Sequence, residues 1–414
     1  MSYTADLHIH SRYAYATSSA LTLENLAVWA KLKGIDLLAA GDFTHPGWFQ
    51  ELQEKLEPAE QGLYLYKGVK FVLGTEISCV YSQGQRQRRV HLLLFAPGLE
   101  AVTRLNRRLA AHGNLASDGR PTIARSARDI AALALDTDLD CILIPAHAWT
   151  PWYGVYGSKS GFDSLEDCFL DLTPQVRAVE TGLSSDPAMN WLVPELRDRT
   201  IVSFSDAHSL PKLGRELTVF PGQPGYTALR EALEFNRVEY TVEFYPEEGK
   251  YHFDGHRACG VRQSPEESSI NGGRCPQCHR PLTLGVAHRT AALSRGKSHW
   301  AKDAAGFTSA GDGRPPFIRL VPLQEIIAQA LGQAETSRRV QKEYHRLISV
   351  LGNELHILVK ASPADLAAAA GEHMAQGILH ARRGEVETEP GFDGKYGRVL
   401  VYPQDLGTSR QGRG

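Results

Sequence analysis

The chain has 414 residues, 42% of them hydrophobic and 22% charged, a composition typical of a folded globular protein of two or three domains. Its formal net charge of −2 excludes a strongly basic overall field, so any contact with nucleic acid must come from local patches. The sequence contains no signal-peptide pattern and no apolar run of the ~18 residues that a membrane helix needs. We therefore expect a cytoplasmic monomer with no membrane partner.

From residue 1 to about 246, short apolar runs alternate with segments of helical periodicity. A helix is predicted from Leu23, because leucine and alanine recur at helical spacing until Gly34 follows as a stop. Further strands are predicted at 35–42, 70–78, 89–95, 140–145, 176–180, 200–205 and 240–244. Strands separated by helical segments favour βα units and a mainly parallel sheet.

Histidine and acidic side chains stand at or near the ends of these predicted strands. In a β/α barrel the carboxyl ends of the strands line one mouth, where functional sites are normally built. The residues expected at this mouth are His8, His10, Asp42, Glu76, His91, His147, Asp206 and His208, with His45 as an alternative ligand. A single buried histidine is more often structural, but so many such residues at successive strand ends favour a site.

Imidazole nitrogens and carboxylate oxygens bind divalent metal ions, and one carboxylate can bridge two ions. We therefore expect two or three divalent ions (zinc, manganese or magnesium), with Glu76 as the bridging ligand. Such a centre acidifies bound water and offsets the charge of a phosphoryl group, so hydrolysis of a phosphate ester is its natural use. We expect Asp206, Glu76 and His147 to take the most direct part in catalysis.

From about 247 to 295 the periodicity fails, and cysteine, histidine, glycine and proline cluster. Two knuckles, with the patterns H-x2-C and C-x2-C, are formed by His256, Cys259, Cys275 and Cys278. This set satisfies the tetrahedral preference of one structural zinc ion, although His252 and His279 are alternatives to His256, and reduced cysteines without metal are a second interpretation. Arg257 and Arg280 are candidates for contact with DNA phosphates, and solvated surface positions explain them equally well.

The stretch 296–316 is rich in glycine, alanine and serine and ends in two prolines, which indicates a linker or an insertion. Residues 317–414 have mainly helical periodicity, with apolar stripes over 323–331 and 340–351. A further helix is expected to begin at Ser362, where a capping residue precedes Pro363.

The strand-end motifs resemble those of the PHP phosphoesterases, the polymerase and histidinol phosphatase family. The matching elements are Asp6-Leu7-His8-Ile9-His10-Ser11, Gly41-Asp42-Phe43-Thr44-His45, Gly74-Thr75-Glu76, Arg89-Val90-His91, Pro145-Ala146-His147 and Ser205-Asp206-Ala207-His208. This resemblance implies a distorted seven-stranded β/α barrel with a two- or three-metal centre. Phe43 stands where that family commonly has histidine, which leaves the third metal position open.

Over nearly its full length the chain also resembles the endonuclease Q family. The segments that carry this resemblance are 251–257, 275–278, 322–327 and 389–394, in the same order as in that family. The resemblance implies an α/β fold in three parts: a PHP-type barrel (1–246), a zinc-binding module (247–295) and, beyond 296–316, a mainly helical C-terminal domain (317–414). Members of that family nick DNA on the 5′ side of uracil, hypoxanthine, xanthine and abasic sites.

The leading hypothesis is therefore a lesion-specific DNA endonuclease that acts on double- or single-stranded DNA, with a sliding clamp as a further candidate partner. Selectivity for a damaged base requires that its edge be read, and we expect the base to be tipped out of the duplex into a pocket beside the metal mouth. Arg12, Tyr13 and Tyr15 are candidates for the rim of that pocket or for a stacking wedge, and ordinary loop positions explain them as well. The alternatives are a small-molecule phosphatase of the histidinol-phosphate class and a non-catalytic zinc-containing DNA-binding protein.

Overall fold

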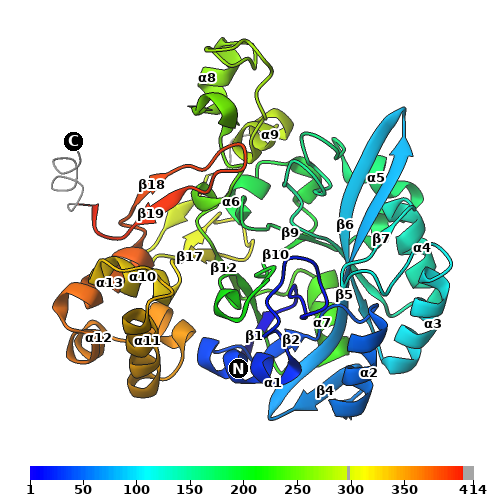
Figure 1. Ribbon diagram of the computed structural model, residues 1–414, viewed down its shortest axis with the longest axis horizontal. Coiled ribbons are helices and arrows are strands. Elements are labelled where there is room, and N and C mark those ends of the chain that lie inside the picture. The colour runs from blue at the N-terminus through cyan, green and yellow to red at the C-terminus, as the bar shows by residue number, and fades with distance from the viewer. Residues whose placement is uncertain (296–298, 404–414) are drawn as a thin grey trace.

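The computed structural model describes residues 1–295 and 299–403, and its centre is a distorted β/α barrel (Figure 1). The seven barrel strands are β1 (Ser2–Asp6), β2 (Leu37–Ala39), β5 (Val69–Gln83), β6 (Arg86–Ala96), β8 (Ile142–Pro145), β9 (Ala178–Glu180) and β10 (Thr200–Val202). Most of these strands are short, but β5 and β6 continue beyond the barrel as a long antiparallel hairpin. The α/β barrel expected from the sequence is confirmed.

Strand pairing in the barrel is mixed. β1, β2 and β5 are parallel neighbours, whereas β6 runs antiparallel to both β5 and β8. The parallel pair of β9 and β10 joins the ring through a hydrogen bond from the Ala148 N–H to the Glu180 carbonyl and through a parallel bridge between Ile9 and Ala207. The mainly parallel sheet predicted from the sequence is therefore wrong, because apolar runs and their spacing do not record strand direction.

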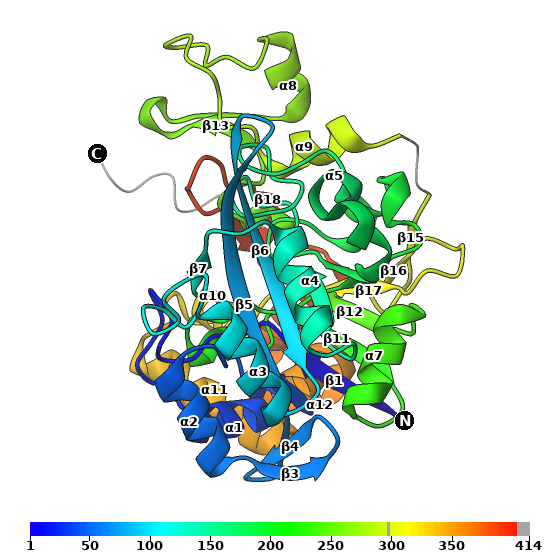
Figure 2. The same ribbon diagram turned by 90° about the vertical axis from the view of Figure 1, so that its right-hand side faces the viewer.

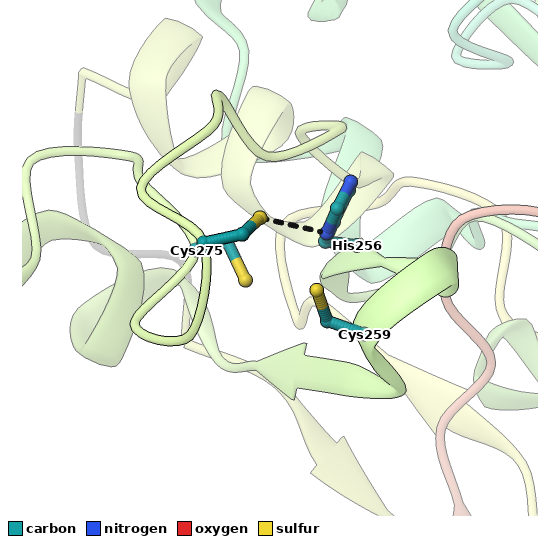
Figure 3. A group of neighbouring side chains, drawn as sticks. His256, Cys259 and Cys275 are labelled. Carbon is teal, nitrogen blue, oxygen red and sulfur yellow. Dashed lines mark hydrogen bonds between the residues drawn. The ribbon is translucent and has the colours of Figure 1, made fainter.

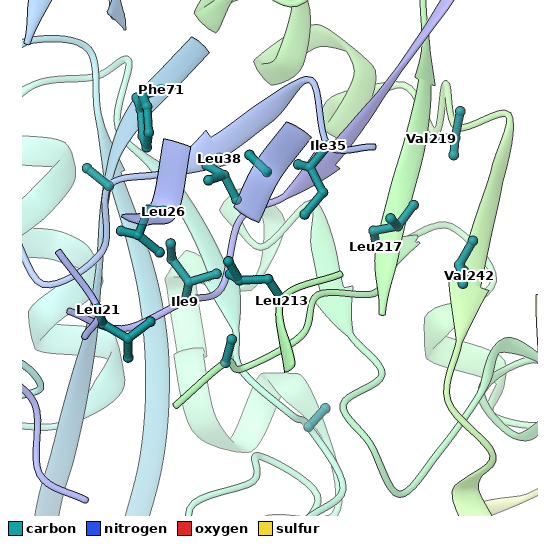
Figure 4. Packing of buried hydrophobic residues seen from close by; sticks show 14 of the residues in the cluster. Ile9, Leu21, Leu26, Ile35, Leu38, Phe71, Leu213, Leu217, Val219 and Val242 are labelled. Atoms are coloured by element: carbon teal, nitrogen blue, oxygen red, sulfur yellow. The ribbon is translucent and has the colours of Figure 1, made fainter. Parts of the chain in front are cut away.

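The barrel helices are α1 (Leu23–Lys33), α2 (Pro46–Lys55), α3 (Leu99–Leu109), α4 (Ala127–Thr137), α5 (Leu165–Phe169), α6 (Pro187–Asn190) and α7 (Tyr226–Glu234). Alternate strand residues divide between two apolar clusters. Leu38 of β2 packs in the cluster that includes Leu26 of α1 (Figure 4), while its neighbour Leu37 packs in a second cluster with Phe204. Each such buried leucine contributes about 1.5–3 kcal/mol, so the alternation fixes which face of each strand meets the helices.

Further strands extend the sheet on both sides of the barrel. On the β5 side these are β3 (Glu57–Glu60), β4 (Leu63–Tyr66) and β7 (Thr122–Ile123), and on the β1 side β11 (Leu217–Pro221), β12 (Tyr240–Glu243), β17 (Phe317–Arg319), β16 (Thr308–Ser309) and β15 (Ala301–Lys302). Part of the expected linker 296–316 thus pairs with the sheet, and its residues 296–298 lie outside the described residues. Because the expected boundaries cross one sheet, the division into domains stays a proposal.

Residues 247–295 form a small module that projects from the same side of the barrel as the β5–β6 hairpin (Figure 2). The module contains β13 (Asp254–His256), β14 (Val261–Gln263), α8 (Pro265–Ile270) and α9 (Val286–Leu293). Its own apolar cluster consists of Val261, Cys275 and Leu282, with Cys259 and Cys278 packed against it. So small a core cannot order this segment alone, and a bound metal ion would supply the missing stability.

The C-terminal part contains α10 (Leu323–Leu331), α11 (Arg338–Leu351), α12 (Pro363–Ala370), α13 (Glu372–Arg383) and the hairpin of β18 (Glu387–Glu389) and β19 (Arg398–Leu400). Ser362 caps α12 as predicted, since its hydroxyl accepts the Asp365 N–H. The apolar residues of these helices belong to the same cluster as those of α1 to α4. No helix among the described residues is long and apolar enough to span a bilayer, and residues 404–414 of the expected domain lie outside them.

Candidate active site

Three of the predicted site residues have an unusual backbone conformation. Asp42, His147 and Asp206 follow the ends of β2, β8 and β10, and their φ angles are 42°, 29° and 46°. Positive φ values cost energy in residues other than glycine, so they persist where the surrounding structure requires them, often at functional sites. At each of these strand ends the side chain contacts other residues of the barrel mouth: Asp42 contacts His10, His147 contacts Glu76, and Asp206 contacts His10.

The first group of potential metal ligands contains His8, His10, Glu76 and Asp206, whose ligand atoms lie within 4.8 Å of one another. His8 Nε2 is 3.5 Å from Glu76 Oε2 and 3.4 Å from Asp206 Oδ1, and this buried nitrogen has no hydrogen-bond partner. His10 Nε2 is 3.3 Å and 3.1 Å from the same two oxygens. Two imidazoles and two carboxylates that share one small space are a donor set that fits a divalent ion.

The second group contains Glu76, His91 and His147. Glu76 Oε1 lies 2.6 Å from His91 Nδ1 and 3.1 Å from His147 Nε2. One oxygen of Glu76 therefore faces each group, which is the arrangement expected of a carboxylate that bridges two ions. The two groups together bring six of the predicted ligands into one centre, and the assignment of these residues as metal ligands stays a proposal.

Two carboxylates lie behind the first group. Glu180 Oε1 is 2.9 Å from His8 Nδ1, and Asp42 Oδ1 is 2.9 Å from His10 Nδ1. Carboxylates in this position orient a histidine so that its Nε2 faces the metal. Asp42 was expected as a ligand itself, but its second oxygen accepts the Ser11 N–H at 2.5 Å, so both oxygens are engaged away from the two groups.

Charges within the centre shift the protonation of its members. Burial disfavours ionisation of Glu76, but His91, Arg120 and His8 together hold its pKa well below the usual range. The pKa of Asp206 is likewise well below its usual range, because His8, His10 and His208 outweigh its burial. Burial lowers the pKa of His91 to about 4. Ionised carboxylates and the neutral imidazole of His91 are the protonation states that bind metal, whereas Glu180 and Asp42 raise the pKa of His8 and of His10 despite burial, so a metal ion would displace their protons.

The two remaining histidines of the prediction lie at the edge of the centre and in neither group. His208 Nδ1 is 2.9 Å from the backbone oxygen of Asp206, and its ring packs 4.7 Å from that of His10. His45 stacks on Tyr13 with ring centroids 4.3 Å apart, and burial lowers its pKa. The described residues thus bring together two ligand groups at this mouth, and a third ion stays without a complete donor set among them.

An open cleft of about 730 Å³ leads to the second group and to Asp206. Its walls come from the β5–β6 hairpin, from the loops 118–122 and 150–153, and from the start of the module. The lining residues that sequence reasoning missed are Arg89, Asp118, Arg120, Trp152, Tyr153 and Tyr251. Arg89 lies on β6, and the others lie in loops that show no periodicity, so only the fold brings them together.

The rim candidates lie elsewhere. Tyr13 donates its hydroxyl to Glu51 at 2.9 Å, and Arg12 forms an ion pair with the same carboxylate. Tyr15 is 76% exposed, and its N–H donates to Asp118. None of these three side chains lines the cleft among the described residues, whereas Trp152 and Tyr251, whose rings meet edge to face at 5.5 Å, do line it.

The module places His256, Cys259, Cys275 and Cys278 together, with ligand atoms within 4.8 Å of one another (Figure 3). His256 Nδ1 lies 3.4 Å from Cys278 Sγ. Burial raises the pKa of Cys275, but the N–H groups of Cys278 and Gln277 lower it to about 7, which favours the thiolate that zinc binds. His252 and His279 are not part of this group. The set therefore fits the predicted structural zinc ion.

Arg257 and Arg280 are exposed on the module. The Arg257 N–H donates to Asp393 at 2.6 Å, and the Arg280 carbonyl accepts the Cys275 N–H at 2.8 Å. Both hydrogen bonds use backbone atoms, so the guanidinium groups stay available to an anion.

The loop that carries Asp206 is fixed from outside the centre. Arg215 donates to the carbonyl of Ser205 at 2.9 Å. Lys212, in the same loop, donates to Glu325 of α10 at 3.0 Å. The C-terminal helices therefore hold the segment from which one carboxylate of the first group projects.

Two solved structures resemble the chain over almost its whole length. The first is the lesion-specific endonuclease PfuEndoQ from Pyrococcus furiosus, with a TM-score of 0.85, 30% identity, and coverage of 98% of this chain and 99% of that one. The second is endonuclease Q in complex with a 27-mer duplex substrate that has an abasic lesion at the active site, with a TM-score of 0.85, 31% identity and 98% coverage of both chains. The chain belongs to the endonuclease Q family.

Within the endonuclease Q fold, residues 322–385, which include α10 to α13, match the model of the MJ0043 C-terminal domain. MJ0043 of Methanocaldococcus jannaschii is 31% identical over 268 residues, which is 63% of this chain, and the match spans about a third (32%) of MJ0043. YqxK of Bacillus subtilis is 28% identical over 419 residues, with 95% of this chain and 98% of that protein covered. The family resemblance predicted from the motifs is confirmed.

Proposed function

We propose that the chain is a metal-dependent DNA repair endonuclease that hydrolyses the phosphodiester 5′ to deaminated bases (uracil, hypoxanthine and xanthine) and to abasic sites. The observation that carries this proposal is the pair of ligand groups that share Glu76 and reach the cleft through His91, His147 and Asp206. Its support is a chain that matches lesion-specific endonuclease Q structures from end to end. The barrel would contain the catalytic site, and the module and the C-terminal helices would bind DNA.

Hydrolysis joins the oxygen of a water molecule to phosphorus and breaks one ester P–O bond, while the water loses a proton and the leaving oxygen gains one. Divalent ions held by His8, His10, Glu76, His91, His147 and Asp206 would acidify the water and offset the phosphate charge when bound. Glu180 and Asp42 would keep His8 and His10 in the orientation that binding requires. Asp206 lies at the open side of the first group, where a carboxylate can accept the proton of the water.

The aromatic wall of the cleft suits a base that has left the duplex. Trp152, Tyr153 and Tyr251 offer ring surfaces for stacking directly beside the second ligand group. Uracil and hypoxanthine both have a carbonyl where the parent base has an amino group, so one donor in this pocket could accept both and reject cytosine and adenine. A mispaired lesion costs less to extrude, and we expect faster single-turnover cleavage of uracil opposite guanine than opposite adenine.

The test uses purified protein and labelled duplexes that each carry one lesion, with undamaged duplexes and a phosphomonoester as separate substrates. We expect metal-dependent nicks 5′ to the lesion and none in the Asp206→Asn variant, which should still bind the duplex. The exposed Asp136→Asn variant is the matched control. Hydrolysis of the phosphomonoester alone would indicate a phosphatase, binding without nicks a non-catalytic protein, and equal cutting of undamaged DNA a general nuclease.

A further inference from the structure

Arg120 lies in a loop that is tied to the barrel on several sides. Asp118 Oδ1 accepts the N–H groups of Tyr15 and Arg120, both at 3.0 Å. The Gly119 N–H donates to the Tyr13 carbonyl at 2.9 Å, and the Gly119 carbonyl accepts the Thr44 hydroxyl at 3.2 Å. The backbone at and before Arg120 is therefore held in place, although the segment has almost no regular secondary structure.

Gly119 also brings this loop against the metal centre. A Cβ atom at Gly119 would lie 2.6 Å from a carboxylate oxygen of Asp42 and 2.9 Å from the Ala14 nitrogen, so no other residue fits without displacement. Asp42 is the carboxylate that orients His10. The loop that carries Arg120 is thus packed against the same carboxylate that contacts His10.

The Arg120 side chain reaches from this loop to the bridging carboxylate. Its Nη1 lies 3.2 Å from Glu76 Oε2, and the side chain is 20% exposed. The exposed part belongs to the cleft wall, together with His91, His147 and Asp206. A guanidinium has five N–H donors in a planar fork, so the donors that Glu76 does not use are available to a group that enters the cleft.

We infer that Arg120 is a catalytic residue that donates hydrogen bonds to a non-bridging oxygen of the scissile phosphate. This inference rests on the proposed function. While the water oxygen bonds to phosphorus and the ester P–O bond breaks, charge is spread over the non-bridging oxygens. A cation fixed beside them stabilises that arrangement more than the free substrate, and it needs no reorganisation during the reaction.

A structural role for Arg120, in which it only neutralises Glu76, makes a different prediction. If Arg120 held Glu76 in place, its loss would release metal ions, because Glu76 serves both ligand groups. If Arg120 contacts the phosphate, its loss leaves the metal ions bound and lowers the affinity for the phosphoryl group. Metal content therefore separates the two roles without any measurement of activity.

The experiment compares the full-length Arg120→Gln and Arg120→Lys variants with wild type, and with Arg125→Gln, an exposed arginine beyond the cleft, as the matched control. We expect single-turnover cleavage of an abasic duplex to fall about 100-fold or more in Arg120→Gln and less in Arg120→Lys. Metal content by mass spectrometry should stay at the wild-type level. The affinity of the metal-loaded variant for inorganic phosphate, measured by calorimetry, should fall about tenfold or more.

A substrate with a methylphosphonate at the scissile position, in which a methyl group replaces one non-bridging oxygen, completes the test. One of its two diastereomers should be cut equally slowly by wild type and Arg120→Gln, because it already lacks the contact. Loss of metal from Arg120→Gln, or unchanged cleavage and phosphate affinity, would overturn the inference. If wild type cut no lesion, the proposed function would fail, and phosphate affinity would still decide whether Arg120 contacts phosphate.

Discussion

Glu180 connects two histidines that come from different strands. One of its oxygens is 2.9 Å from His8 Nδ1, and the other accepts the His147 N–H at 2.5 Å. His8 belongs to the first ligand group and His147 to the second. A single buried carboxylate thereby fixes the spacing of both groups, although it is part of neither.

We predict that Glu180→Gln will lower the affinity of the barrel for metal about 10- to 100-fold, because partners of ligating histidines typically have effects of this size. Competition with a chelator, followed by metal analysis, measures the change. The exposed Glu231→Gln variant of α7 should bind metal as wild type does. Wild-type affinity in Glu180→Gln would show that His8 keeps its orientation without this hydrogen bond.

Glu243 is a second buried carboxylate, which accepts a hydrogen bond from Thr181, the residue after Glu180. It accepts the hydroxyl groups of Ser203 at 2.7 Å and Thr181 at 3.1 Å, and burial raises its pKa to about 8 from an ordinary value of 4.5. Between pH 4.5 and about pH 8, Glu243 of the folded protein therefore keeps a proton that the unfolded chain has lost. In that window the contribution of Glu243 to stability falls as pH rises, by about 1.4 kcal/mol for each pH unit.

Glu243→Gln removes this titration, and we predict that its free energy of unfolding will depend less on pH than that of wild type between about pH 5 and 8. Urea unfolding at several pH values measures both proteins. Parallel pH curves would mean that Glu243 is already ionised in the folded state.

At the scale of elements, the cysteine module has the smallest core relative to its length, and its four potential zinc ligands come from two separate knuckles. We predict that Cys275→Ser will lose one zinc ion, disorder the module and weaken DNA binding, while the barrel keeps its metal ions. Metal analysis and a filter-binding assay measure these effects. The Cys141→Ala variant, which alters a cysteine of the barrel, should retain the zinc ion, and retention of zinc in Cys275→Ser would contradict the assignment.

The sequence predicts the elements and ligands that local patterns specify. The α1 helix, the strand ends and both cysteine knuckles follow from spacing, because period and capping are properties of neighbouring residues. The direction of β6 and the pairing of β16 with β17 depend on contacts between distant segments. Asp42 is a further example. The sequence motif places a carboxylate near His10, but only the fold shows that its two oxygens contact His10 Nδ1 and the Ser11 N–H.

At the scale of the whole molecule, the barrel and the C-terminal helices meet through a buried ion pair. Lys33 at the end of α1 lies 2.7 Å from Glu354, and their side chains are 2% and 6% exposed. Glu354 also accepts the hydroxyl of Tyr344 at 2.8 Å and the N–H of Leu323 at 3.1 Å. The two regions thus share a charged contact as well as an apolar cluster.

We predict that Glu354→Ala will lower the free energy of unfolding by about 3–5 kcal/mol, because it leaves the Lys33 ammonium buried without a partner. The double variant Lys33→Met, Glu354→Leu should recover most of this loss. Arg104→Ala, which breaks the exposed pair with Asp138, should cost no more than about 1 kcal/mol. Denaturant unfolding measures all three, and a small effect of Glu354→Ala would mean that water reaches Lys33.

Through the loop that carries Asp206, the C-terminal helices affect the reaction although they lie away from the cleft. Arg215 holds the backbone before Asp206, and Lys212 in the same loop is bound to Glu325 of α10. A sequence change in α10 that tilted this helix would move the carboxylate without touching a ligand or the DNA. Substitutions in the C-terminal helices would therefore change the turnover rate. Selection for a faster or slower repair reaction would then act on residues that make no contact with the substrate.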